Sequence, residues 1–248
     1  MRRSYDHPAR RGTVPRVELR DVMRTTPATR EFTDEPVPDE VVHDLLDVAR
    51  FAPSGGNRQA WRVVVLRDPD LRHRIRDLYV LSWREYMAHV REGLVPFAAG
   101  GDGRWHGPAV DLEAARATPA PLPFADHLDE VPVLLLVAAD LTRLAAVDNG
   151  LDRQGISAGA SVYPFVHNLL LAARDAGLGG VMTTVLARQE PAVRELVGLP
   201  DDHAVAALVA LGRPVREVTK LRRAAVEEFT TVDRVDGPPF TAPHPRVS

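Results

Sequence analysis

The sequence predicts an α/β or α+β sandwich in which a mixed central sheet is flanked by helices. One observation is the alternation of helical patterns with strand-like runs between residues 39 and 211, which is typical of a layered domain. A second is the continuous apolar run from Val131 to Ala139, which predicts a strand buried on both faces. A third is a length of 248 residues without an internal repeat, which fits one large domain.

Helical periodicity begins at residues 17–24, where Leu19, Val22 and Met23 share one face. The next helix starts near Asp39, the expected N-cap, and runs to about residue 49. The remaining elements, in order, are a strand at 61–66, a helix at 69–92, strands at 131–139 and 179–185, a helix at 191–197 and a strand at 204–211.

A further helix is predicted from Ser161 to Arg174, and Gly177 is a natural stop for it. The apolar surface of this helix is wider than one stripe, because Leu171, Ala172 and His167 broaden it. We therefore expect this helix to lie at a subunit interface. The stripe itself consists of Val162, Phe165, Val166, Leu169, Leu170 and Ala173.

Residues 93–130 contain glycines and prolines that interrupt every periodicity. A break of this length inside a compact domain is usually a functional lid or an insertion, and Trp105, His106 and Phe124 are candidates to face a substrate there. We expect residues 17–234 to form a single domain, residues 1–16 a flexible N-terminal arm, and residues 235–248 a C-terminal tail.

Composition excludes several function classes. A net charge of −3 gives no general attraction for nucleic acid or an anionic membrane. The chain has no cysteine, so disulfides and thiolate catalysis are excluded. No apolar run approaches the ~20 residues of a membrane helix, and no apolar segment follows the basic N-terminus. We expect a cytoplasmic protein.

The stretch from Ala52 to Trp61 combines backbone freedom with polar side chains. Gly55 and Gly56 allow a sharp bend or a close approach to a flat ligand. The hydroxyl of Ser54 and the amides of Asn57 and Gln59 can donate and accept hydrogen bonds. Such groups suit the edge of a heteroaromatic ring, although an ordinary polar turn has the same composition.

This stretch resembles the Ala-Pro-Ser-x-x-Asn-x-Gln-Pro-Trp signature of the nitroreductase family of FMN-dependent oxidoreductases, with Ala60 where the family usually has proline. The resemblance implies a nitroreductase-like fold, bound FMN and a homodimer of the domain-swapped type. It implies that Pro53 and Ser54 lie against the flavin and that Asn57 helps to hold it at the dimer interface, with Gln59 beside them.

The resemblance also assigns a phosphate site. Its family motif is Arg-Arg-Ser-x-Arg followed by an aromatic residue, and here only Arg30 aligns, while Thr26, Pro27 and Ala28 occupy the first three positions. Arg24, in the preceding turn, is the substitute for the missing arginines. How the phosphate is held therefore stays open at this point.

Two later segments complete the implied site. In the family, one segment lies beside the pyrimidine and phosphate ends of the flavin. The residues that match it here are Gly179, Gly180, Met182 and Thr183. In the family, a basic element near the C-terminus completes the phosphate site. The residues of this element here are Lys220, Arg222 and Arg223. An arm that wraps the other subunit follows this element in the family.

By resemblance, the function is reduction of nitroaromatic, quinone or similar planar acceptors by NAD(P)H through a ping-pong mechanism. The flavin would carry the chemistry, so no catalytic acid or base is assigned. The alternatives are a flavin-dependent dehydrogenase or oxidase of a biosynthetic metabolite, and a binding protein without turnover. Gly-x-Gly-x-x-Gly and His-Glu-x-x-His are both absent, so neither a Rossmann nicotinamide site nor that metal motif is expected.

A serine hydrolase is the remaining alternative. Residues 155–159 satisfy Gly-x-Ser-x-Gly around Ser157, and His203 follows with Asp201 and Asp202 beside it. A nucleophile elbow has to follow a buried strand, yet residues 151–154 are largely polar.

Overall fold

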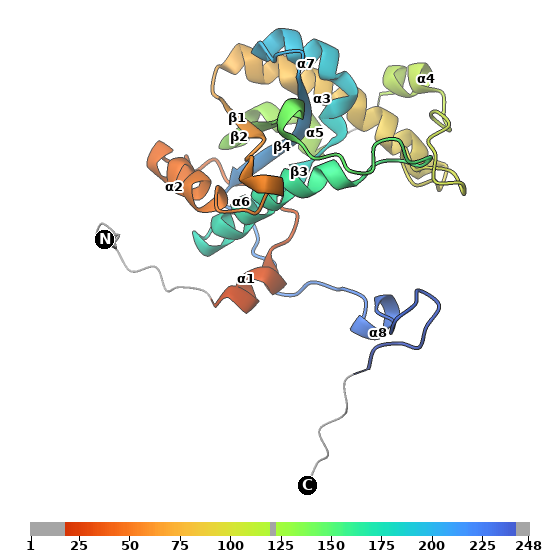
Figure 1. Cartoon of the computed structure of the whole chain (residues 1–248). Helices are drawn as coiled ribbons and strands as arrows, with labels where there is room; N and C mark the ends of the chain where they lie inside the picture. Colours follow the sequence, from red (N-terminus) through yellow and green to blue (C-terminus); the bar gives the residue numbers. More distant parts are fainter. Residues whose placement is uncertain (1–17, 120–122, 242–248) are drawn as a thin grey trace.

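The computed structural model describes residues 18–119 and 123–241. A four-stranded sheet lies between helical layers (Figure 1). Its strands stand in the order β1-β2-β4-β3. They are β1 (Trp61–Leu66), β2 (Val133–Asp140), β3 (Gly179–Thr183) and β4 (His203–Gly212).

Strand direction corrects the predicted mixed sheet. All three neighbouring pairs are antiparallel, and the bridge of Ala28 to Gly180 adds an isolated parallel contact at the β3 edge. The alternation of helices and strands in the sequence does not fix strand direction, because β1 and β2 are joined through α3, and β3 and β4 through α7, yet both pairs are antiparallel. The strands β2 and β3 run parallel but do not touch, because β4 lies between them.

Helices α2 (Asp39–Ala49) and α6 (Tyr163–Asp175) cover one face of the sheet. Phe165, Val166 and Leu169 of α6 are buried there, and the Phe165 ring stacks on Trp61 with centroids 4.9 Å apart. The predicted stripe is therefore used by the protomer's own core. His167 and Tyr163 are the residues of α6 that stay exposed.

Helices α3 (Pro69–Arg91) and α7 (Glu190–Val197) cover the opposite face. Leu134 and Leu136 of β2 face this layer, whereas Leu135 and Val137 face α2 and α6. Every residue of β2 is buried, which explains the continuous apolar run in the sequence. Tyr79 of α3 lies within 3.2 Å of the Thr183 hydroxyl, and burial raises the pKa of Tyr79 to about 12.

The ends of several elements differ slightly from the sequence prediction. Pro38, not Asp39, is the N-cap of α2, and α6 begins at Tyr163 because residues 157–161 form a 3-10 turn. Gly177 follows α6 with a φ of 75°, as its predicted role requires. Strand β3 ends at Thr183, and Val185–Gln189 forms a 3-10 turn.

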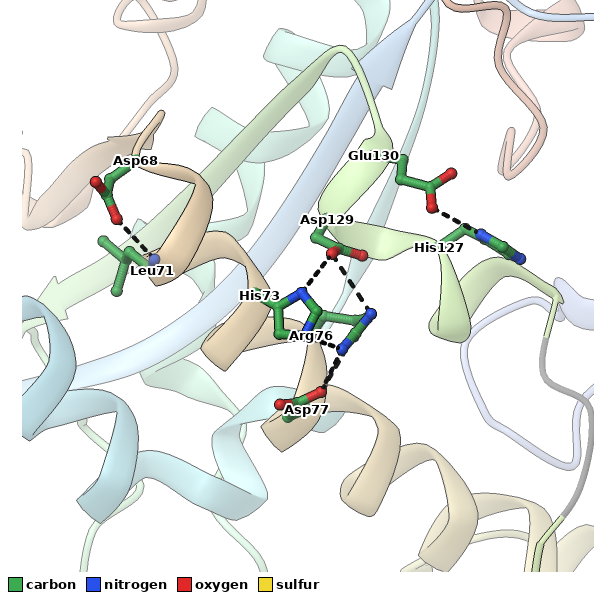
Figure 2. Close-up of polar contacts among 8 residues, drawn as sticks. All are labelled: Asp68, Leu71, His73, Arg76, Asp77, His127, Asp129 and Glu130. Atoms are coloured by element: carbon green, nitrogen blue, oxygen red, sulfur yellow. Dashed lines mark hydrogen bonds and ion pairs between the residues drawn. The ribbon is translucent and has the colours of Figure 1, made fainter.

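Residues 93–119 project from the end of α3 and contain α4 (Leu112–Ala117), which Asp111 caps. The chain then returns through α5 (Pro123–Asp126) and the turn Leu128–Glu130. Figure 2 shows how this return is fixed on α3, where Asp129 pairs with His73 at 3.1 Å and with Arg76 at 3.5 Å. The region predicted as a lid or insertion thus contains helices.

Helix α1 (Leu19–Thr25) precedes the first strand in the chain, and α8 (Val226–Phe229) follows the last. Figure 1 shows α8 and its flanking chain lying away from the sheet. Phe229 and Val235 there are 69% and 98% exposed. The predicted arm at 1–16 and the second half of the predicted tail, residues 242–248, lie outside the described residues. No helix within the described ranges has both the length and the apolarity that a membrane crossing requires.

Gly180 offers a test of core packing. A methyl group at this position would lie 2.8 Å from Leu170 Cδ2 and closer still to Leu211, so Gly180→Ala should destabilise the fold by about 1–3 kcal/mol through overpacking. Urea unfolding measures the change. Gly101→Ala is the matched control, because a methyl group there meets nothing within 4 Å. Equal stability of the two variants would contradict the packing at the β3 edge.

Candidate functional site

The loop between α2 and β1 holds its polar residues in a strained backbone. Gly56, Asn57 and Gln59 all have φ between 50° and 60°, a left-handed conformation that glycine and asparagine adopt most readily. Ser54 Oγ accepts a hydrogen bond from Gln59 N at 3.0 Å, and Gln59 Nε2 donates to Asn57 Oδ1 at 3.1 Å. The predicted polar residues therefore form one local hydrogen-bonded unit.

The backbone of this loop is hydrogen-bonded to the chain just before α6, and most of its polar side chains are exposed. Gly55 N donates to Ser161 Oγ at 3.0 Å, just before α6 begins. Ala52 and Ala60 are buried at its two ends, while Pro53, Asn57 and Gln59 are exposed and Ser54 is half-buried. The loop presents donors and acceptors at the N-terminal end of α6.

The predicted phosphate segment lies elsewhere, beside β3. Thr29 N donates to Gly180 O at 2.9 Å, and Arg24, Ala28 and Arg30 are exposed. The Thr26 hydroxyl donates to Val22 O at 2.6 Å, so its proton is directed at α1. The arginine side chains and not this hydroxyl are the available donors for an anion.

The chain after β4 returns to the same segment. Thr33 N donates to Arg213 O at 2.9 Å, and Val215 N donates to Glu31 O at 3.1 Å. The three cations predicted to complete the phosphate site follow a few residues later and are all exposed: Lys220, Arg222 and Arg223. Among the described residues no hydrogen bond or ion pair joins them to residues 24–30.

Arg174 is a basic residue near this segment that the sequence reasoning missed. Its Nε donates to Thr25 Oγ1 at 3.2 Å, and its guanidinium lies 3.8 Å from a Glu217 carboxylate oxygen. It therefore lies between the two predicted phosphate segments. Its place in the last turn of a helix that leads into β3 was the available signal.

The predicted residues of β3 divide into two groups. Gly179, Gly180 and Thr183 are buried, and a methyl group on Gly179 would lie 2.6 Å from Thr29 Oγ1. These glycines allow close packing of residues 28–30 and of α6. Met182 is 37% exposed, so its side chain is the one in β3 that is open to a ligand.

The structure separates the loop from the phosphate segment. The loop contacts the chain just before α6, whereas Thr25 contacts the last turn of α6, and a helix of this length spans about 20 Å. The loop also leads into β1, while Thr29 pairs with β3, and β1 and β3 are the two opposite edges of the sheet.

A cleft of about 330 Å³ lies beside the phosphate segment. Its lining includes Arg30 and Phe32, together with Phe124 and His127 from the return of the chain to α3. Of the residues expected to face a substrate, Phe124 is therefore the one beside a predicted cofactor residue. Trp105 is 48% exposed, and His106 pairs with Asp102 at 2.9 Å.

Ser157 is a partner of Asp148 and not of a histidine. Its hydroxyl donates to Asp148, which also accepts from Ile156 N at 2.8 Å and pairs with Arg153 at 3.0 Å. The Ser157 hydroxyl, with these other donors, holds the pKa of Asp148 well below its usual range. Ser157 lies in a 3-10 turn and not directly after a strand. This geometry gives the hydrolase alternative no support.

His203 is likewise engaged in a polar cluster, with Asp202 at 2.7 Å. Asp140 lies close enough that the three side chains could share a cation. However, Asp140 already accepts from the Thr142 hydroxyl at 2.6 Å and faces Arg62 at 3.6 Å. These partners account for the cluster as an ion-pair network at the ends of β2 and β4.

Comparison with known proteins places the chain among flavin enzymes. A model described as the nitroreductase family matches residues 23–213. The chain is 30% identical to chloronitrobenzene nitroreductase from Comamonas testosteroni over 221 residues, covering 85% of this chain and 95% of the relative. It is 29% identical to iodotyrosine deiodinase 1 from Mus musculus over 214 residues, covering 86% and 68% respectively.

A solved structure shares the fold. The NADPH:FMN oxidoreductase from Vibrio harveyi, complexed with NAD+, superposes with a TM-score of 0.56 at 21% identity. The match covers 87% of this chain and 77% of that one.

The Asp148 contacts predict a pH-dependent contribution to stability. Because the folded-state pKa is depressed, the carboxylate contributes stability that is fully present above its unfolded value of 3.8 and is lost as pH falls through the folded value. Asp148→Asn should therefore be less stable than the wild type at pH 7, and the difference should narrow below about pH 4. Urea unfolding at several pH values measures the difference in unfolding free energy between the two proteins. A difference that stays constant with pH would contradict a stabilising role for the ionised Asp148 carboxylate.

Proposed function

The chain belongs to the nitroreductase family of flavin oxidoreductases, and we propose that it is a cytoplasmic, homodimeric enzyme that binds FMN. Reduced nicotinamide would reduce the flavin, and a planar electron-poor acceptor such as a nitroaromatic or a quinone would reoxidise it. The single observation that carries this proposal is the polar loop at residues 53–59, in which Gly56, Asn57 and Gln59 have left-handed backbone conformations and Ser54 accepts from Gln59 N.

The donor set of this chain fits FMN. The amides of Asn57 and Gln59 and the hydroxyl of Ser54 suit the ring edge, and exposed arginines suit a phosphate. Arg24 and Arg30 supply that charge from one segment, and Arg222 and Arg223 supply it from the other. The bound flavin would supply the hydride chemistry, while these residues bind and orient it.

The separation of the two groups of residues supports a site shared between protomers. Within one protomer they lie at opposite ends of α6 and at opposite edges of the sheet. In the arrangement we propose, one protomer contributes the loop at 53–59, and the other contributes Arg30 with Met182. The exposed apolar residues of the C-terminal arm, such as Phe229 and Val235, would then cover the partner.

The similarity to iodotyrosine deiodinases favours a second candidate function. In this alternative, the same reduced flavin site takes a halogenated phenol as acceptor and releases halide. The ring again stacks on the flavin, so the two candidates share a binding mode and differ in the acceptor.

Anaerobic reduction tests the proposed function. Mixing the yellow FMN-loaded protein with NADH or NADPH should bleach the flavin before any acceptor is present. Adding a nitroaromatic, a quinone or iodotyrosine should then restore the colour, and steady-state plots should give parallel lines. A flavin that neither nicotinamide bleaches, but that an oxidisable organic substrate reduces, would favour the dehydrogenase or oxidase alternative.

Mixed dimers test the shared site. Arg30→Ala removes charge-assisted hydrogen bonds worth about 1.5–3 kcal/mol each, so FMN binding should weaken roughly tenfold or more. Asn57→Gly keeps the left-handed backbone and removes the amide. Each variant homodimer should bind FMN weakly, while a heterodimer purified through two different tags should hold FMN at one of its two sites.

The heterodimer distinguishes a site shared between protomers from a site contained within each protomer. If each protomer held its own flavin, neither protomer of the mixed dimer would contain an intact site, and tight binding would not return. Riboflavin provides the control for Arg30→Ala, because it lacks the phosphate and its affinity should change little.

A further inference from the structure

Glu85 is a fully buried carboxylate on α3 that belongs to none of the sites above. Its Oε1 accepts from Arg116 Nε at 2.5 Å, and its Oε2 accepts from Arg188 Nε at 3.0 Å. A buried carboxylate is tolerated only when it is paired. Arg116 lies in α4 and Arg188 in the turn after β3, so one carboxylate joins two elements that are far apart in sequence.

The same cluster holds the start of the projecting segment. The Arg188 guanidinium lies 4.7 Å from the centre of the Phe97 ring, on which the His89 ring also packs at 4.6 Å. Arg84 adds a further contact to the other end of the segment, donating to Arg116 O at 2.9 Å. Residues 97 and 116 are thus both attached to the buried face of α3.

Helix α3 also supports the end of β3 directly. Tyr79, on the same buried side, pairs with the Thr183 hydroxyl at 3.2 Å, and Arg188 follows five residues after Thr183. The end of β3 and the segment 94–117 therefore share one support, in which Glu85 pairs with one arginine from each of them.

We propose that Glu85 is a positioning residue that couples the segment 94–117 to the end of β3, so that FMN binding against β3 orders this segment. The inference rests on the proposed function, because Met182 and its neighbours would contact the flavin. Coupling of this kind is reciprocal: a segment that FMN orders in turn strengthens FMN binding by the same factor.

Limited chymotrypsin digestion with and without FMN tests the coupling. The exposed Leu94 and Trp105 are the expected cleavage sites. FMN should slow cleavage of the wild type by about fivefold or more, whereas in Glu85→Gln the protection should fall below about twofold. FMN affinity, followed by flavin fluorescence, should weaken by the same factor that the protection loses.

Two further variants provide a second test of the coupling and a control. Arg116→Ala breaks the link from its partly exposed side and leaves Glu85 paired with Arg188, so it should reproduce the loss of protection even if Glu85→Gln folds poorly. Arg74→Ala, at an exposed position on the same helix, should keep the wild-type protection.

The outcomes distinguish the two hypotheses. If Glu85→Gln and Arg116→Ala are cleaved faster with and without FMN by the same factor, the residues stabilise the fold only and the inference is overturned. Wild-type protein that binds FMN without protection of the segment overturns the inference and leaves the proposed function standing. Wild-type protein that binds no FMN overturns both.

Discussion

The structure depends on the burial of β2 from both sides. Each of its residues is buried, and alternate side chains supply the core beneath α2 and α6 and the core beneath α3 and α7. A strand in this position fixes the order of the layers, because any helix that is to cover apolar surface must pack on one of its faces. The polar loop at 53–59 and the segment at 24–30 are attached at the margins of this sandwich.

Helix α6 connects the core to both of the polar segments that we propose as binding residues. One face fills the core, and its two ends contact the two polar segments, through Ser161 just before its first turn and Arg174 in its last. The length of the helix therefore sets the distance, within one protomer, between the residues that we propose for the flavin ring and those that we propose for its phosphate. In the shared site that we propose, a second protomer brings these two groups of residues together.

Much of the fold follows from sequence, because periodicity reports burial. The run at 131–139 and the stripe of Phe165, Val166 and Leu169 both proved to be core. Strand direction and order did not follow, since helices join antiparallel neighbours here and the insertion of β4 between β2 and β3 depends on pairing between distant residues. Arg174 and Glu85 were missed for a similar reason: the roles of both depend on partners far away in sequence, which a local motif does not contain.

The position of β4 also has a consequence for synthesis on the ribosome. It is the last strand in the chain, yet it pairs with both β2 and β3. Until residue 212 has emerged, the apolar β2 can pair only with β1, and one of its hydrogen-bonding edges stays open. Long-range pairing of this kind forms slowly and leaves nascent chains prone to aggregation. The interval between translation of β2 and of β4 is thus the period in which a chaperone would matter most.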